Sequence, residues 1–180
     1  MTKKLEIIQL SVQFIKKASF KDLSYDYLAK QLAITKTAIH YYFKNKKDLG
    51  LAICNYLETS LQEQFNYFME YSNETAWEFI HRRHQTLSQD DICPIVSLQT
   101  DLNEYEEEMQ LAIIHLVAKE YQIYREILAR NMPITSAETL AQIHLSSIKG
   151  AQIYNRTLNV PFSETILKKI KQEIGEAENT

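Results

Sequence analysis

Glycine and proline are scarce in this chain. Only three residues of each type occur among 180, too few for the many tight turns that a protein built of short strands requires. The apolar residues recur at spacings of three and four, which is the period of a helix face, rather than at the spacing of two that is typical of a strand. The sequence therefore predicts an all-α protein.

The composition favours a soluble, cytoplasmic protein that does not enter a membrane. Apolar residues make up 45% of the chain, and no apolar run approaches the roughly 18 residues that span a bilayer. The first residues, Met1 to Glu6, lack the apolar segment of a signal peptide. Cys54 and Cys93 lack the paired spacing of a zinc site or a disulfide framework, so we expect both to be core thiols.

Charge divides the chain into two parts. Residues 1–50 hold ten lysines and four acidic residues, a net charge of +6, whereas residues 51–180 hold ten basic and nineteen acidic residues, a net charge of −9. A basic segment favours binding to a polyanion, whereas an acidic body does not. This asymmetry predicts a small nucleic-acid-binding module carried by a larger acidic body.

The basic part has the pattern of three helices. The first is expected over 3–18, with Leu5, Ile8, Val12 and Ile15 on its core face. Ser24 and Thr35 can cap two short helices over 25–32 and 36–42, because a hydroxyl accepts from a free backbone N–H at a helix start. The turn between them is very short, so the two helices must cross steeply, as in a helix-turn-helix motif over about 24–43.

The second short helix could read DNA from the major groove. With Ile39 and Phe43 buried, the other side chains can face outward, where Lys36 and Thr37 can bond base edges and aromatic rings can add apolar contacts. Lysines at the end of the helix suit phosphates, which position a protein without specifying sequence. The candidate DNA-binding residues are Ser24, Thr35, Lys36, Thr37, His40, Tyr41, Tyr42, Lys44 and Lys46.

The segment "LAKQLAITKTAIHYYFKNKKDLGLAI", residues 28–53, resembles the DNA-binding segment of the TetR family of bacterial transcriptional regulators. The shared features are Leu28-Ala29, Ile34-Thr35, the run from Ile39 to Phe43, and Asn45-Lys46 before Leu49. His40 stands where the family usually has tyrosine. Ala33 replaces a frequent glycine, at a cost of about 1 kcal/mol if the turn needs a left-handed backbone. Asp26 is expected to repel phosphate.

The resemblance implies a protein of about nine helices, with a DNA-binding domain over 1–48 and a ligand-binding and dimerisation domain over 49–180. Periodicity places the later helices near 46–71, 74–88, 95–103, 105–130, 135–157 and 162–175. The implied function is that of a repressor, which binds a palindromic double-stranded DNA operator as a homodimer and is released by a small-molecule effector.

The last two helices carry apolar stripes with interspersed small residues. By resemblance to the family they would form a four-helix dimer interface, and the alternative is an intramolecular core. The candidate interface residues are Ile143, Ser147, Gly150, Ala151, Tyr154, Ile166, Ile170 and Ile174.

The middle helices are expected to bind the effector. Trp77, Ile80 and His84 recur on one face of 74–88, and His84 and Glu120 are polar residues on otherwise apolar faces. Apolar walls with a few convergent polar groups are typical of a small-molecule site. Alternatively, these two polar groups partner each other or lie at a rim. The candidate ligand-binding residues are Trp77, Ile80, His81, His84, Ile113, Leu116, Glu120 and Tyr124.

Two other functional classes compete with a regulator. Glu78 and His81 have the Glu-x-x-His spacing of helical metal enzymes, but di-iron bundles need the motif twice and no convincing second copy occurs. A basic helical adaptor that binds an acidic protein would explain the charge division but not the ring cluster from His40 to Phe43. We therefore expect no enzymatic activity, metal or cofactor.

Overall fold

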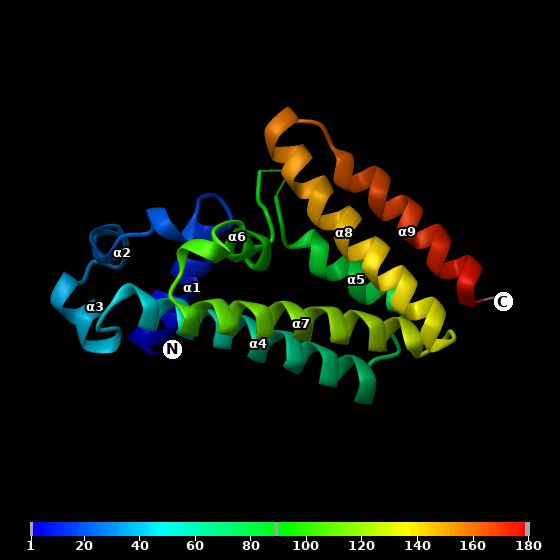
Figure 1. The fold of residues 1–180 in the computed structure, drawn as a ribbon, viewed down its shortest axis with the longest axis horizontal. Helices are drawn as coiled ribbons and strands as arrows, with labels where there is room; N and C mark the ends of the chain where they lie inside the picture. The colour runs from blue at the N-terminus through cyan, green and yellow to red at the C-terminus, as the bar shows by residue number, and fades with distance from the viewer. Residues whose placement is uncertain (1, 89, 179–180) are drawn as a thin grey trace. The chain divides into compact units, whose positions relative to one another are not determined.

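The computed structural model describes residues 2–88 and 90–178. These residues form nine α-helices, two short 3-10 helices and no strand (Figure 1), which confirms the all-α prediction. The chain divides into two compact units, one of Met1–Thr59 and Pro94–Val117 and the other of Ser60–Cys93 and Ala118–Thr180. We expected the DNA-binding domain to end at residue 48 and the ligand-binding domain to begin at residue 49. That boundary stays a prediction, because the two units are defined by their packing and not by their function.

The first unit contains the three N-terminal helices and short elements that come later in the chain. Its elements are α1 (Lys3–Ile15), η1 (Phe20–Asp22), α2 (Tyr25–Leu32), α3 (Lys36–Tyr42), the first part of α4 (Lys46–Glu70), α6 (Pro94–Thr100), η2 (Leu102–Glu104) and the first part of α7 (Glu107–Ala129).

The two short helices have the predicted bounds and caps. The Ser24 hydroxyl accepts from the backbone N–H of Tyr27 at 3.1 Å, and the Thr35 hydroxyl accepts from that of Ala38 at 3.1 Å. Ala33 ends α2 in the left-handed conformation, with φ 51° and ψ 42°. A side chain in this conformation costs about 1 kcal/mol relative to glycine, so the strain anticipated at Ala33 is present.

The first helix is shorter than predicted and buries three of its four predicted core residues, Ile8, Val12 and Ile15. It ends at Ile15, and the segment before α2 contains η1 instead of a longer α1. Ile7 is fully buried, whereas Leu5 is only half-buried. Ser11 is also fully buried, which its hydroxyl permits by donating 2.8 Å to the carbonyl oxygen of Ile7. A hydrogen bond within the helix thus allows a polar residue on the core face.

The core of the first unit brings α4 and α7 into close contact. Its fully buried side chains include Ile15, Leu28, Ile39, Leu49, Ile53, Ile113 and Leu116. A Cβ atom at Gly50 would lie 2.6 Å from Cε of Met109. The glycine therefore lets the Met109 side chain lie directly against the α4 backbone.

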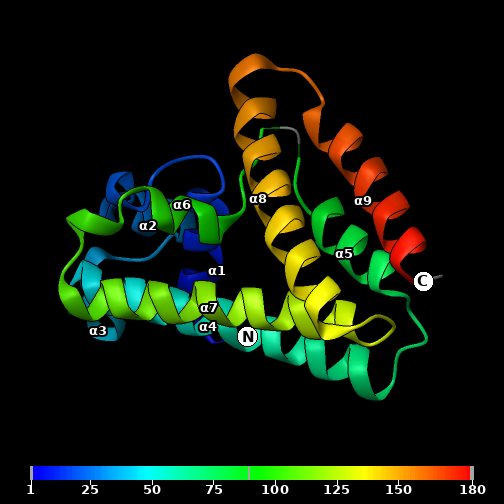
Figure 2. The ribbon, with the colours of Figure 1, turned by 45° about the vertical axis from the view of Figure 1, so that its right-hand side comes forward.

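The second unit contains α5 (Ala76–Gln85), α8 (Ile134–Leu158), α9 (Phe162–Glu178) and the remainders of α4 and α7. Helices α8 and α9 lie side by side in both views (Figures 1 and 2). Helix α5 begins at Ala76, two residues later than predicted, because Thr75 and Glu78 form a capping box. The other later helices match their predicted ranges to within three residues.

Two groups of apolar side chains fill the second unit. Phe68 of α4 and Phe79 of α5 pack edge to face, with ring centroids 5.1 Å apart. Between α8 and the helices around it, the buried apolar residues include Ala137, Ala141, Ile148, Ala151, Ile170 and Ile174. Within the described part of the chain, we find no helix with the length and apolar character needed to cross a bilayer.

Candidate functional site

Helix α3 presents most of the predicted DNA-binding residues to solvent. Ile39 is completely buried, and Phe43 is almost so. Lys36, Thr37, His40, Tyr41, Tyr42 and Lys44 are all exposed, as are the capping residues Ser24 and Thr35. Tyr41 is 83% exposed, against 36% for Tyr42. The structure thus brings the predicted reading residues together on the outer face of one helix.

Tyr25 holds the end of α3 in place, a role that the sequence did not indicate. Its single hydroxyl proton is shared between the carbonyl oxygens of Asn45 at 2.6 Å and Phe43 at 3.1 Å. Its ring meets the His40 ring at 4.8 Å. Burial, with a smaller contribution from Asp48, raises the pKa of Tyr25 to about 12. The hydroxyl therefore stays protonated and remains a donor at neutral pH.

Lys36 is paired with an acid of α2. Its Nζ lies 2.8 Å from Oδ2 of Asp26, and both side chains are largely exposed. A pair as exposed as this one is weak, so it can exchange for a stronger contact. Asp26 thus contacts a candidate base-reading residue, and its predicted repulsion of phosphate stays a prediction.

Lys46 is less available than the other candidate lysines. Its ammonium donates to the Lys21 carbonyl oxygen and lies 5.2 Å from the centre of the Phe20 ring. Burial lowers the pKa of Lys46, Asp22 opposes that shift and Lys21 adds to it. The side chain is turned toward η1 and must reorient to reach a phosphate.

Asn45 and Asp48 cap the start of α4. The Asn45 Oδ1 accepts from the backbone N–H of Asp48 at 2.8 Å, and Asp48 Oδ2 accepts from that of Lys44 at 3.1 Å. The Asn45 bond is the first half of a capping box, whereas Asp48 accepts from the residue before the cap and not from Asn45 itself. The asparagine three positions before an acid could have predicted it from sequence. It fixes the direction of the chain between α3 and α4.

Several lysines of the basic segment pair with acids of the first unit. Lys21 contacts Glu104 of η2, and Lys47 lies 3.3 Å from Glu106 and 2.9 Å from Glu108. These contacts join η1 and the start of α4 to η2 and to the chain around the start of α7. Part of the positive charge near α3 is therefore already balanced within the unit.

The second unit contains a polar cluster, which we call the Lys149 cluster and define as Arg83, Cys93, Glu120 and Lys149. The Lys149 Nζ lies 2.9 Å from Oε1 of Glu120 and 2.9 Å from Sγ of Cys93. Arg83 reaches the same Glu120 oxygen at 3.8 Å. Glu120 thus has the partners that a buried carboxylate needs, although His84 is not among them.

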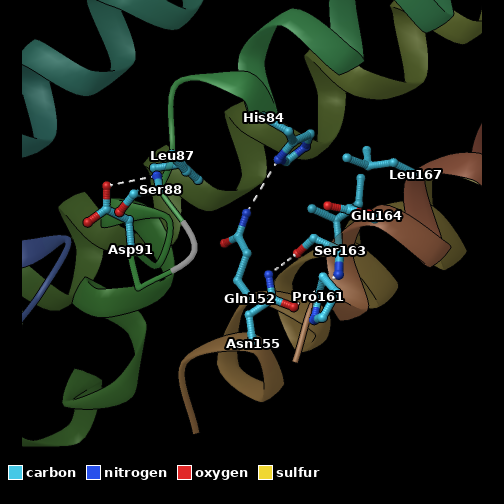
Figure 3. A pocket seen from close by; sticks show the side chains of 11 residues that line it. His84, Leu87, Ser88, Asp91, Gln152, Asn155, Pro161, Ser163, Glu164 and Leu167 are labelled. Carbon is cyan, nitrogen blue, oxygen red and sulfur yellow. Dashed lines mark hydrogen bonds between the residues drawn. The ribbon is translucent and has the colours of Figure 1, made fainter. Parts of the chain in front are cut away.

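His84 lies at the edge of a cavity beside this cluster (Figure 3). The Gln152 side chain donates to His84 Nδ1 at 3.3 Å, and its oxygen accepts from the backbone N–H of Cys93 at 2.9 Å. Burial and then the charges of Lys149, Arg83 and His81 lower the pKa of His84 to about 3. The imidazole is therefore neutral at physiological pH and can accept from Gln152.

The cavity has a volume of about 210 Å³ and a mixed lining. Its walls come from the end of α5, the segment after it, α8, and the start of α9. Its lining residues are His84, Leu87, Ser88, Asp91, Ile148, Gln152, Asn155, Pro161, Ser163, Glu164 and Leu167. Seven of these eleven residues are polar, so the lining suits a small organic molecule that carries several polar groups.

The other predicted ligand-binding residues are dispersed. Trp77 is half-buried and stacks on His81 at 4.8 Å, with Lys171 over its ring. Ile80 is a core residue, and Tyr124 is buried. Ile113 and Leu116 belong to the core of the first unit. The apolar stripe expected on α7 is therefore divided between the cores of the two units and does not line one cavity.

The predicted dimer residues also fall into two groups. Ile143 and Tyr154 are about half exposed, at 49% and 55%. Ser147, Gly150 and Ile166 are half-buried. Ala151, Ile170 and Ile174 are buried within the chain itself. These last three residues therefore lie in an intramolecular core, which was the alternative to a dimer interface.

The Glu-x-x-His spacing on α5 serves structural roles. Glu78 accepts from the Thr75 backbone N–H at 2.8 Å in the capping box, and His81 stacks on Trp77. In the described residues, no group of three or more His, Cys, Asp or Glu side chains is placed to hold a metal ion.

No protein-family model and no curated protein sequence matches this chain. Solved structures do match it along almost its whole length. A TetR transcriptional regulator from Legionella pneumophila has a TM-score of 0.86 at 20% identity, covering 96% of this chain and 97% of that one.

Two further regulators show the same likeness. A TetR-family transcriptional regulator from Agrobacterium tumefaciens has a TM-score of 0.79 at 14% identity, covering 94% of this chain and 96% of that one. The transcriptional regulator FadR from Bacillus subtilis, in complex with stearoyl-CoA, has a TM-score of 0.64 at 19% identity, covering 93% and 97%. The chain therefore has the fold of TetR-family transcriptional regulators.

Proposed function

We propose that this protein is a transcriptional regulator that binds double-stranded DNA through α3. The observation that carries the proposal is the capped pair of contacting helices α2 and α3, with Ile39 buried and Lys36, Thr37 and Tyr41 exposed. A helix of this kind fits the major groove, with its first turns toward base edges.

The side chains of this helix have separate tasks in the proposed complex. Lys36 and Thr37 occupy the first turn of α3, from which they reach base edges, and Lys36 exchanges Asp26 for a base acceptor. Tyr42 and Lys44 bond phosphates at the end of the helix. Lys46 adds a phosphate contact only after leaving the Lys21 carbonyl. Base contacts then specify sequence, whereas phosphate contacts set the register.

The regulator acts as a homodimer on a palindromic operator. The exposed apolar residues of α8, among them Ile143 and Tyr154, form the contact between subunits. Two identical subunits related by a two-fold axis place two copies of α3 on symmetric half-sites.

A small molecule bound in the second unit releases the protein from its operator, which makes the protein a repressor. The cavity beside His84 and Gln152 offers the effector a neutral imidazole, amides, hydroxyls, the carboxyl groups of Asp91 and Glu164, and an apolar part of the wall. Helix α4 is shared by both units, so it can carry a change from the second unit to the start of α4 beside α3. The effector must bind the DNA-incompetent state more tightly.

Selection of bound duplexes from a random pool tests the proposal. The wild-type protein should enrich a palindrome, and a Lys36→Ala/Tyr41→Ala double variant that keeps the wild-type melting temperature should not. Failure of the wild type to enrich any duplex at low salt would remove DNA reading as the function. Enrichment of a non-palindromic site would retain DNA binding and remove the symmetric dimer.

A further inference from the structure

Lys36 and Asp26 form an ion pair between the starts of the two helices of the helix-turn-helix motif. Lys36 is the first residue of α3, and Asp26 lies in the first turn of α2. The Lys36 Nζ and the Asp26 Oδ2 are 2.8 Å apart, and the two side chains are 51% and 74% exposed. A hydrogen-bond donor and an acceptor therefore lie side by side in solvent, next to the other candidate base-reading residues of α3.

The proposed complex with DNA opens this ion pair. When the Lys36 ammonium turns to a base acceptor, the Asp26 carboxylate loses its cation, and among the described residues no other side chain bonds it. A carboxylate held against DNA without a donor is unfavourable, because it loses water and lies in the field of the phosphates. The DNA can supply the missing donor, since the amino groups of cytosine and adenine face the major groove.

The amino group within reach of Asp26 depends on the base that Lys36 reads. Within a base pair, the keto oxygen of one base accepts from the amino group of the other, so these two atoms lie about 2.9 Å apart. The Lys36 donor and the Asp26 acceptor are 2.8 Å apart. The two side chains can therefore transfer together to one base pair, Lys36 to the keto oxygen and Asp26 to the amino group.

This arrangement discriminates between base pairs by the order of their groups. A reversed pair would set the ammonium against an amino group and the carboxylate against a keto oxygen, and both contacts would be repulsive. G·C and T·A share the favourable order, but guanine offers N7 beside O6, whereas thymine has a methyl group beside O4. The ammonium therefore favours guanine, and Asp26 then faces cytosine.

We propose that Asp26 is a specificity-determining residue that accepts from N4 of cytosine, in the G·C pair whose guanine Lys36 reads. This inference rests on the proposed function, because Asp26 can meet a base only if α3 enters the major groove. The competing role of Asp26 is repulsion of phosphate, which would weaken binding to every sequence alike.

Reversal of one base pair tests this inference. Fluorescence anisotropy measures binding to the selected operator and to the same duplex with the base pair read by Lys36, located by Lys36→Ala, reversed in each half-site. Asp26→Ala should reduce the cost of reversal by about fivefold or more per half-site, because a good base contact discriminates by at least that factor. Glu6→Gln is the matched control. It removes an acid paired with Lys3 at 2.7 Å, away from α3, and should keep the wild-type preference.

A modified base separates direct reading from an effect of Asp26 on the position of Lys36. N4-methylcytosine still pairs with guanine, but its methyl group replaces the amino hydrogen that faces the major groove. It should weaken wild-type binding by about fivefold or more, and binding of Asp26→Ala by less than about twofold. Equal weakening of both proteins would show that Asp26 acts only through Lys36, and the inference would be wrong.

The remaining outcomes separate this inference from the proposed function. If Asp26→Ala, at its wild-type melting temperature, binds every duplex more tightly by one factor, Asp26 repels phosphate and does not read a base. A pair other than G·C at the position that Lys36→Ala relaxes would also overturn the inference. In both cases DNA reading by α3 would stand. Failure of the wild type to enrich any duplex at low salt would overturn the inference and the proposed function together.

Discussion

The Tyr25 hydroxyl donates to the carbonyl oxygen of Asn45 at 2.6 Å, which ties the start of α2 to the loop between α3 and α4. Tyr25→Phe removes this bond and the one to Phe43 while keeping the ring against His40. We expect the free energy of unfolding to fall by about 0.5–1.5 kcal/mol in total, because a single hydroxyl proton is shared between the two acceptors. Urea titration measures it, and Tyr41→Phe, at an exposed ring, is the matched control. An unchanged midpoint for Tyr25→Phe would show that water replaces both bonds.

At the end of α2, a substitution of the left-handed residue should raise the free energy of unfolding instead of lowering it. Ala33 has φ 51°, so Ala33→Gly should raise the free energy of unfolding by up to about 1 kcal/mol. Ala38→Gly, in the helical backbone of α3, should lower it by about 0.5–1 kcal/mol. Both changes remove one methyl group, so urea midpoints compare them directly. A loss of stability in both variants would mean that the turn does not strain Ala33.

How well the sequence predicted each region depended on how local its determinants are. Ser24 and Thr35 cap α2 and α3 through bonds to residues three positions along the chain, so spacing alone located these helices. Gly50 meets Met109, and Lys149 meets Cys93, across long stretches of sequence. Periodicity marks which face of a helix is apolar, but not which partner covers it. Ile113 and Ile170 therefore appeared as ligand and dimer candidates although both lie in cores.

His84 should make the stability of the second unit depend on pH. Its pKa is about 3 in the folded chain against a usual 6.5, so the unfolded chain binds the proton more readily. Stability should therefore fall as pH drops below about 6.5, by at most about 1.4 kcal/mol per pH unit.

The comparison that isolates this effect is wild type against His84→Gln, because carboxylates and His144 titrate in both proteins. Urea midpoints from pH 7 to pH 5 should fall more steeply for the wild type. Parallel curves would show that the His84 ring is solvated enough to keep its ordinary pKa.

Two lysines near α3 should affect DNA binding differently. Lys36→Ala should relax preference at one base position, since a good base contact discriminates by about 1–3 kcal/mol. Lys44→Ala should weaken all sequences alike and reduce the log-log salt slope by about 0.9. Fluorescence anisotropy with the selected operator and its single-base variants, at several salt concentrations, measures both effects. If the two variants change affinity in the same way, the division into reading and positioning residues is wrong.

Burial within the chain separates two kinds of residue that sequence alone placed in one dimer interface. Ile143 is 49% exposed and Ile170 is 2% exposed. Ile143→Glu should give a monomer by sedimentation velocity with unchanged helical circular dichroism, because the charge disrupts only a contact between copies. Ile170→Asp should instead lower the free energy of unfolding by several kcal/mol, at about the cost of burying an unpaired charge, and should do so at every protein concentration. If Ile143→Glu remains a well-folded dimer, the exposed face of α8 is not part of the interface. If Ile170→Asp is instead a stable monomer, α9 is part of the interface.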